Sequence, residues 1–362
     1  MPIARKHLID PRQPTWVHCI SRCVRRAYLC GENALGESVD HRKAWIEARL
    51  RTIAGVFAVE VAGYSVMSNH LHLVLRMRPA AVASWSAREV AERWCALFDR
   101  GLPKRADGRV VPATVAHLSG NGAWIAERRA RLADLSWLMR ALCEDVARRA
   151  NREDQCTGRF WEGRFKSVPL LDQAALVACM AYVDLNPIRA KLADRPETAR
   201  FTGARARIKA RQAHRAAARL RRSGRAAQAA DVLRRAGLAA AARDGEDGLW
   251  LAPVSRCVAG TDAQPAATPL TSDDYLRLID ATGRLLRDGK RGRIPPDLAP
   301  ILARLDLDLE HWLAAMLGWR QFAGRAIGAL AARAAEATRL GLRWVQNRCA
   351  LFGLSRPAPA IG

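Results

Sequence analysis

The spacing of apolar and polar residues in the first 80 positions predicts a small β-sheet. Residues 16–24 and 56–67 are largely apolar and rich in β-branched side chains, which predicts two strands. Residues 70–76 form a third predicted strand, joined to the second by the short polar link Ser68-Asn69. A link of this length predicts an antiparallel hairpin. Between the first two strands, Asp40 is a candidate cap for a helix that ends near residue 55.

Helical spacing follows in the middle of the chain. The pattern changes between residues 79 and about 131. Residues 86–98 are predicted to form a helix, and a loop rich in Gly, Pro and Arg is expected to follow and to run past Gly120-Asn121-Gly122. Residues 132–151 form the next predicted helix, because four apolar side chains recur there at helical spacing. They are Leu135, Leu138, Leu142 and Val146.

A last strand and helix complete this part of the sequence. Residues 164–171 are a short predicted strand, after which Asp172 can cap a helix. Pro187 is expected to end that helix, because proline disfavours helical geometry in the residue before it. The order of strand, helix, strand hairpin, helices, strand and helix predicts an α+β fold with a ferredoxin-like antiparallel sheet and helices on one face.

The character of the sequence changes after residue 196. Residues 200–225 contain ten Lys and Arg residues and no acidic one, and five of the arginines share one face of a predicted helix. They are Arg207, Arg211, Arg215, Arg219 and Arg222. A later apolar stripe of Leu309, Trp312, Leu313 and Met316 is typical of core or dimer contact. We therefore divide the chain into a core domain, 1–196, with an enlarged segment at 79–131, and a basic helical extension, 197–362.

Charge adds a class of partner. Lys and Arg outnumber Asp and Glu by 59 to 35, a formal net charge of +24, which favours binding to nucleic acid. A base bias of the genome is the alternative explanation for a composition rich in Arg and Ala. The apolar runs are shorter than the roughly 20 residues that a membrane span requires, and no charged-then-apolar leader opens the chain, so a cytoplasmic location without membrane contact is expected.

Cysteine usage does not indicate a disulfide framework or a zinc knuckle. The nine cysteines are scattered, and none belongs to a C-x-x-C pair. Cys19 and Cys23 lie beside His18 on a predicted strand, where they would be about 13 Å apart at about 3.3 Å per residue. We interpret them as small buried side chains.

Two histidines on the third predicted strand are candidate metal ligands. Because side chains alternate along a strand, His70 and His72 point to one face while Leu71 and Leu73 point to the other. Two neutral imidazoles that lie this close can share one cation. Ordinary packing of the two rings remains the alternative.

The helix that follows Asp172 carries a tyrosine and an amide at helical spacing. Tyr182 and Asn186 are four residues apart, so they lie one turn from each other on the same face. They lie off the apolar stripe that includes Leu176 and Met180, so we expect them on the face turned away from the core. A surface tyrosine near a helix end is the alternative interpretation.

Three runs of residues resemble one enzyme family when they are taken together. They are Gly63–Leu75, which contains His-Leu-His, Gly158–Ser167, and Ala181–Ala190, which contains Tyr-Val-Asp-Leu-Asn-Pro. In this order they resemble the tyrosine transposases with the HUH signature (histidine, hydrophobe, histidine), in particular the IS200-like and REP-associated branch. The resemblance covers the chain up to about residue 195.

The resemblance implies an activity and roles for individual residues. Tyr182 would be the nucleophile that forms a 5′-phosphotyrosine with single-stranded, hairpin-containing DNA during transposition. His70, His72 and Asn186 would bind Mg²⁺ or Mn²⁺, and the protein would act as a homodimer. Basic residues of the second run are candidate DNA contacts. The arginines of the later helix lie outside the part that the resemblance covers; we expect them to bind DNA phosphates because of their charge, and a solvated helix face is the alternative. The candidate contacts of both groups are Arg159, Arg164, Lys166, Arg207, Arg211, Arg215 and Arg219.

Three other functions remain open from the sequence. A replication initiator or relaxase shares the signature but often has a second tyrosine or a third clustered histidine, and Tyr182 has no neighbouring tyrosine. A DNA- or RNA-binding regulator could keep the fold without cutting. A zinc hydrolase built on His70 and His72 would need a further ligand and an activated water.

Overall fold

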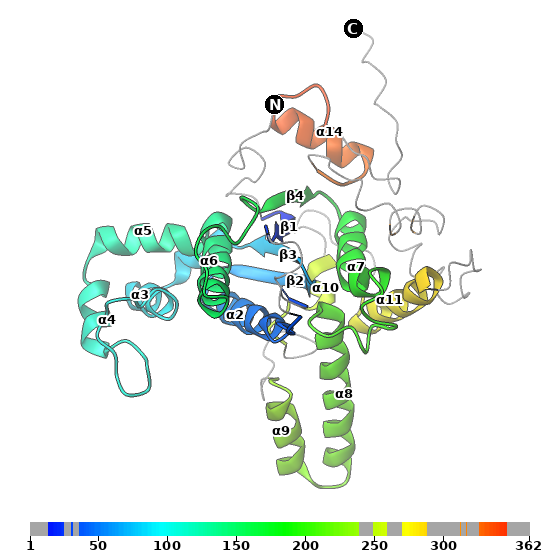
Figure 1. Cartoon of the computed structure of the whole chain (residues 1–362), viewed down its shortest axis with the longest axis horizontal. Helices are drawn as coiled ribbons and strands as arrows, with labels where there is room; N and C mark the ends of the chain where they lie inside the picture. Colours follow the sequence, from blue (N-terminus) through cyan, green and yellow to red (C-terminus); the bar gives the residue numbers. More distant parts are fainter. Residues whose placement is uncertain are drawn as a thin grey trace.

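The computed structural model describes most of the chain and shows an α+β protein. One four-stranded antiparallel sheet lies between helices (Figure 1). The described residues are 14–24, 30–31, 36–238, 249–258, 270–287, 312, 316 and 326–345. Among them, every helix is too short or too polar to cross a membrane.

The sheet confirms the strands that the sequence predicts. Its members are β1 (Trp16–Arg22), β2 (Val59–Val66), β3 (His70–Met77) and β4 (Lys166–Leu170). They lie in the order β2-β3-β1-β4, and each neighbouring pair is antiparallel. The predicted hairpin is formed by β2 and β3, which pair from Val59 with Met77 to Val66 with Leu71, with a register shift between Val61 and Gly63.

Helices cover both faces of the sheet. The face that carries Leu71 and Leu73 packs against α2 (Arg42–Val56) and α6 (Leu135–Glu153). The other face, which carries Val74, packs against α7 (Gln173–Arg189). The prediction that helices lie on one face is therefore wrong. Residues 175–188 of α7 are all buried, because neighbouring elements surround this helix.

The ends of two helices differ from the prediction. Asp172 caps α7 as expected, and its side chain accepts a hydrogen bond from the backbone N–H of Ala175 at 2.8 Å. Pro187 does not end α7, which continues to Arg189, because a proline in the last turn removes only one backbone donor. The N-cap residue of α2 is His41, and no side chain caps the helix by a hydrogen bond. The prediction that Asp40 caps α2 is therefore wrong.

The segment predicted as a long loop contains helices. After η1 (Pro79–Ser84) and α3 (Ala87–Cys95), the chain forms α4 (Pro112–Ser119) and α5 (Gly122–Leu132). The run Gly120-Asn121-Gly122 is a junction between helices, because Asn121 caps α5 by accepting a hydrogen bond from the N–H of Trp124. Turn-forming residues therefore mark a helix start here.

The extension after residue 196 shares a hydrophobic core with α7. It contains α8 (Gly203–Arg222), α9 (Ala226–Arg235), α10 (Val254–Val258), α11 (Ser272–Arg287) and α14 (Leu330–Arg339). Side chains of α8, α10 and α11 belong to the same buried cluster as those of α7, together with Trp312 and Met316. The boundary at 196/197 therefore passes through one core. Leu309 and Leu313 lie outside the described residues.

Candidate active site

Three histidines lie on the sheet face that α7 covers. His70 and His72 share this face of β3, and the register of β1 brings His18 to it, because His18 pairs with Val74. His18 Nε2 lies 3.0 Å from His72 Nδ1, and the two rings stack with their centroids 5.1 Å apart. His18 is thus a site residue that the sequence argument did not include, although its place on a strand offered the signal.

Burial keeps His18 uncharged. Removal from water, followed by the charge of His70, lowers the pKa of His18 to about 3. A neutral imidazole has one donor and one acceptor nitrogen, so the contact with His72 couples the tautomers of the two rings: one nitrogen donates and the other accepts. Groups that hold a ligating histidine in this way orient it toward its metal.

His70 has a comparable partner. Its Nδ1 lies 2.5 Å from Oδ1 of Asn69, and its ring lies edge-on to that of His72 at 4.7 Å. Both histidines therefore have Nδ1 engaged by a neighbour, which assigns Nε2 as the nitrogen that would bind a metal. Among the described residues, no three His, Cys, Asp or Glu side chains form a group that could hold a metal ion. A third protein ligand would be of another residue type.

Tyr182 lies beside these histidines. Its ring is edge-on to that of His72, with centroids 5.7 Å apart, and 6.2 Å from that of His18. The structure thus brings together two motifs that are 110 residues apart in the sequence. The expectation of a face turned away from the core is wrong, since Tyr182 is 3% exposed and Asn186 is 1% exposed.

Asn186 fits a hard cation. Neither its side-chain oxygen nor its side-chain nitrogen has a hydrogen-bond partner among the described residues, although both atoms are buried. An unsatisfied buried amide costs roughly 1–3 kcal/mol, so such a position usually has a purpose. An amide oxygen is a suitable ligand for Mg²⁺ or Mn²⁺. The residues present therefore fit a site of two imidazoles and one amide oxygen.

Arg189 is a second site residue that the sequence argument missed. Its guanidinium lies 5.1 Å from the centre of the Tyr182 ring. The two residues are seven apart, or about two helical turns, so the spacing could have revealed it. A permanent cation close to a tyrosine ring favours the phenolate form, and a guanidinium can bind a phosphate oxygen.

Of the predicted DNA contacts, those near β4 lie close to the site. Ile20 pairs with both His72 and Lys166, so these three residues form one row across the sheet on one face. At about 4.8 Å per strand, Lys166 starts about 10 Å from His72. Arg159 and Arg164 are also exposed and precede β4.

The arginines of α8 do not form one exposed face. Arg207 is buried and donates hydrogen bonds of 2.9 Å to the carbonyl oxygens of Ala62 and Ala252. The interpretation of Arg207 as a DNA contact is therefore wrong, because its guanidinium holds backbone groups inside the protein. Arg211 forms an ion pair with Asp273, whereas Arg215 and Arg219 are exposed.

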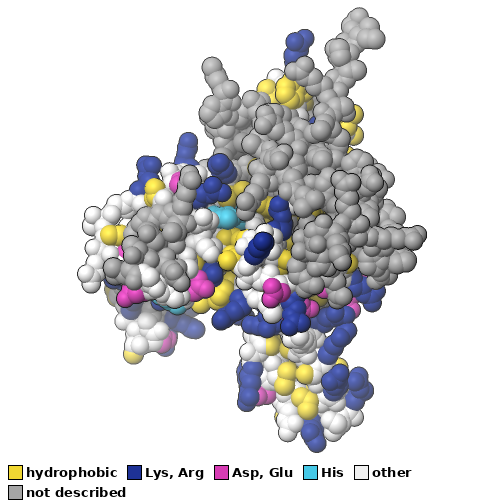
Figure 2. All heavy atoms as spheres, turned by 45° about the vertical axis from the view of Figure 1, so that its right-hand side comes forward, with side chains coloured by type: hydrophobic (Ala, Val, Ile, Leu, Met, Phe, Trp, Pro, Cys, Tyr) yellow, Lys and Arg dark blue, Asp and Glu magenta, His cyan; other side chains and the backbone are white. Residues whose placement is uncertain are grey.

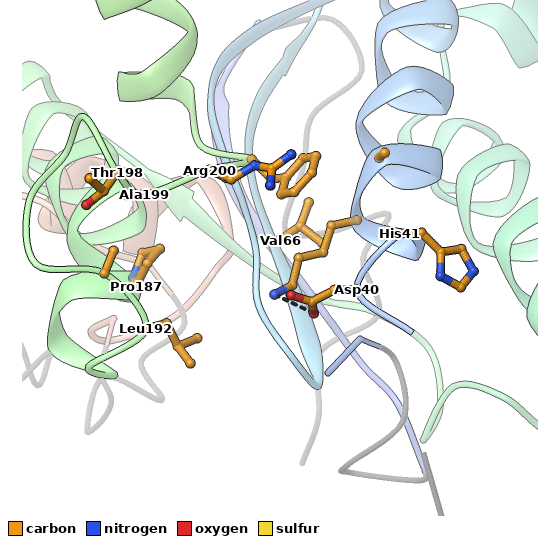
Figure 3. Close-up of a pocket in the computed structure, with 12 residues that line it drawn as sticks. Asp40, His41, Val66, Pro187, Leu192, Thr198, Ala199 and Arg200 are labelled. Atoms are coloured by element: carbon orange, nitrogen blue, oxygen red, sulfur yellow. Dashed lines mark ion pairs between the residues drawn. The ribbon is translucent and has the colours of Figure 1, made fainter. Parts of the chain in front are cut away.

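A cavity of about 440 Å³ lies at the C-terminal end of α7 (Figure 3). It lies between the start of α2, the end of β2 and the chain that follows α7, and Pro187, the neighbour of Asn186, lines it. Lys43 and Arg200 supply positive charge, and Lys43 is paired with Asp40 at 2.9 Å. The three histidines and Tyr182 do not line this cavity, so the cavity is separate from the candidate site.

Comparison of the chain with protein-family models, with curated proteins and with solved structures finds no match.

Proposed function

We propose that this protein is a metal-dependent endonuclease and strand transferase for single-stranded DNA, of the HUH transposase type, with Tyr182 as its nucleophile. The observation that carries the proposal is the position of the Tyr182 ring, 5.7 Å from that of His72. A strand with two histidines and a helix with a tyrosine and an amide meet at one place. The sequence resemblance assigns the same residues to one reaction.

The arrangement of the fold supports the same family. The order of elements β1, α2, β2, β3, α6, β4 and the strand order β2-β3-β1-β4 are those expected of a ferredoxin-like core. In this interpretation, α2 and α6 are the two connecting helices on one face. Helix α7 then carries the nucleophile across the opposite face, where the histidines lie.

The reaction exchanges one phosphate ester for another. The Tyr182 oxygen forms a bond to the phosphorus and loses its proton, while the bond from phosphorus to the 3′ oxygen breaks and that oxygen gains a proton. The product is a 5′-phosphotyrosine with a free 3′-hydroxyl on the other strand end. Because the ester bond is conserved, a second 3′-hydroxyl can reverse the step without ATP.

The residues around Tyr182 have separable tasks. His70, His72 and Asn186 would hold the divalent cation, which polarises the phosphate and stabilises the leaving oxygen. His18 would orient the His72 ring through the 3.0 Å contact between His18 Nε2 and His72 Nδ1. A tyrosine has a pKa near 10 in water, so the hydroxyl needs a nearby positive charge, and Arg189 lies over the ring at 5.1 Å.

The proposed reaction requires that a DNA strand can reach Tyr182. At 3% exposure, Tyr182 cannot meet a DNA strand unless covering residues move. The same burial favours a second candidate, a DNA- or RNA-binding regulator in which Tyr182 is a packed side chain. The two functions differ in one product, the covalent adduct. Dimer formation stays a prediction of the resemblance.

The test is incubation of the full chain with a panel of single-stranded, stem-loop DNAs in the presence of Mg²⁺ or Mn²⁺. We expect a protein–DNA adduct that survives denaturation and maps to Tyr182 by mass spectrometry. Tyr182→Phe should abolish the adduct, and chelation of the metal should do the same.

Tyr64→Phe is the matched control, because Tyr64 is also buried and its hydroxyl contacts Glu47 on the far side of the sheet. This variant should retain the adduct. If the parent binds these DNAs and forms no adduct with any of them, the regulator is the better function. An adduct that persists in Tyr182→Phe would exclude Tyr182 as the nucleophile.

A further inference from the structure

Helices α8 and α9 form a hairpin that projects away from the sheet (Figure 1). Residues 203–235 of this α8–α9 hairpin contain eleven Lys and Arg residues and one acidic residue, Asp231. Figure 2 shows Lys and Arg side chains along the projecting part. With 20 residues, α8 is about 30 Å long at 1.5 Å per residue.

The root of the α8–α9 hairpin is fixed to the body of the protein. Arg207 holds two buried carbonyl oxygens, and Arg211 forms an ion pair of 2.7 Å with Asp273 of α11. The backbone N–H of Ala204 donates a hydrogen bond to Asp184, a residue of α7. The hairpin therefore extends from a rigid base that includes the helix of Tyr182.

Most exposed cations of the hairpin lack local compensation from the described residues. Six exposed side chains form no ion pair with any described residue, whereas Asp231 is already paired with Arg234 and Arg235. The six are Lys209, Arg215, Arg219, Arg221, Arg222 and Arg225. Like charges one helical turn apart repel each other, so this arrangement weakens the hairpin until a polyanion neutralises it.

The direction of these side chains follows from the contact between the two helices. Ala210, Ala213 and Ala217 of α8 pack against Ala229 and Leu233 of α9. Nine residues, or two and a half turns, separate Ala210 from Arg219 and Ala213 from Arg222. The stripe of Arg215, Arg219 and Arg222 therefore lies on the outer side of α8, opposite the helix contact.

The same segment lacks the side chains that bind unpaired bases. Residues 203–235 contain no Phe, Trp or Tyr. Proteins that bind single strands without sequence preference combine a basic groove with aromatic rings on which the bases stack, whereas contacts to duplex phosphates require no aromatic ring. The chemistry of the hairpin thus matches a double-stranded backbone.

We propose that the α8–α9 hairpin binds the phosphate backbone of a DNA duplex, which would be the stem of the stem-loop substrate. The inference rests on the proposed function only for the identity of that stem. The outer stripe of α8 contacts phosphates, and the rigid root sets the distance between the stem and Tyr182. Binding of this kind does not depend on base sequence.

The test compares two full-length variants with the same change in charge. The first is Arg215→Gln/Arg219→Gln/Arg222→Gln. The second, the control, is Arg100→Gln/Arg105→Gln/Arg109→Gln in the exposed loop between α3 and α4. Binding to a fluorescent 20-base-pair duplex and to an unstructured single strand is measured between 50 and 200 mM salt.

We expect the first variant to weaken duplex binding about 10- to 100-fold at 100 mM salt. The slope of log affinity against log salt should fall by about 2 to 3, since each phosphate contact contributes about 0.9. Affinity for the single strand should change less than about threefold, and the control should match the parent. Thermal unfolding of both variants verifies that they are folded.

Equal loss of duplex binding in both variants would overturn the proposal, because it would indicate net charge alone. Loss confined to the single strand would also overturn it. The adduct assay separates this outcome from that of the proposed function. If no adduct forms but the first variant alone loses duplex binding, the α8–α9 hairpin is a duplex-binding surface and the proposed chemistry is wrong.

Discussion

The Tyr275 hydroxyl donates a hydrogen bond of 2.6 Å to the carboxylate of Asp184, which lies two residues after Tyr182. Asp184 also accepts the N–H of Ala204 at 2.8 Å. Burial raises the pKa of Asp184 to about 6, and nearby Arg207 opposes that rise. Helices α7, α8 and α11 thus meet at one buried carboxylate, which explains why the extension and α7 share a core.

Tyr275→Phe should destabilise the protein by about 1–3 kcal/mol, because it removes a hydrogen bond to a buried, charged group. The measurement is urea unfolding at pH 8. In a double-mutant cycle with Asp184→Asn, the cost of Tyr275→Phe should shrink by more than half. If the losses in unfolding free energy of the two single variants simply add in the double variant, the Tyr275 hydroxyl stabilises the fold through some other contact.

Cys257 of α10 should report whether the extension stays packed on the core. Burial raises the pKa of this thiol to about 12, so about one molecule in ten thousand is thiolate at pH 8. We expect slow alkylation in the parent protein and faster alkylation in Tyr275→Phe. Cys143, a thiol with its pKa raised to about 11, packs on the other face and should react equally slowly in both proteins. Equal rates at Cys257 would show that α10 does not depend on Tyr275.

Periodicity predicted the strands and most helices because these signals are local. Alternation along β3 placed His70 and His72 on one face, and Asp172 marked the start of α7. Periodicity did not predict the burial of Tyr182 and Asn186. A single apolar stripe predicts one buried face of α7, but packing from several directions buries this helix on all sides. Burial of that kind depends on the partners of a helix, which no window of sequence contains.

Contacts between residues that are far apart in the sequence could not be predicted from local sequence patterns either. His18 joins the site through strand pairing over 54 residues, and Arg207 is buried because it holds two distant carbonyl oxygens. The spacing of basic residues in the sequence is the same whether a side chain faces solvent or an internal hydrogen-bond acceptor. Only the tertiary structure shows that Arg207 is buried and that Arg215 and Arg219 are exposed.

His18→Phe should lower the affinity of the protein for Mn²⁺ about 10- to 100-fold, as loss of a partner that orients a ligating histidine does elsewhere. Phenylalanine preserves the ring but removes the nitrogen that lies 3.0 Å from His72. The measurement is Mn²⁺ binding to the free protein by electron paramagnetic resonance. His117→Phe, on the exposed side of α4, is the control and should bind as the parent does. Unchanged Mn²⁺ affinity in His18→Phe would mean that His18 does not orient a ligand of the proposed metal site.

Lys166→Gln should weaken binding of single-stranded DNA, because this side chain begins about 10 Å from His72 on the same sheet face. Loss of one phosphate contact should reduce the salt dependence of single-strand binding by about 0.7 in logarithmic slope and raise the concentration for half-saturation several-fold. The measurement is fluorescence anisotropy with an unstructured oligonucleotide at 50 to 200 mM salt. Lys104→Gln, an exposed lysine on the loop between α3 and α4, carries the same charge change and should leave the slope unaltered. If both substitutions change the slope equally, single-stranded DNA does not reach the proposed site along the row of residues His72, Ile20 and Lys166.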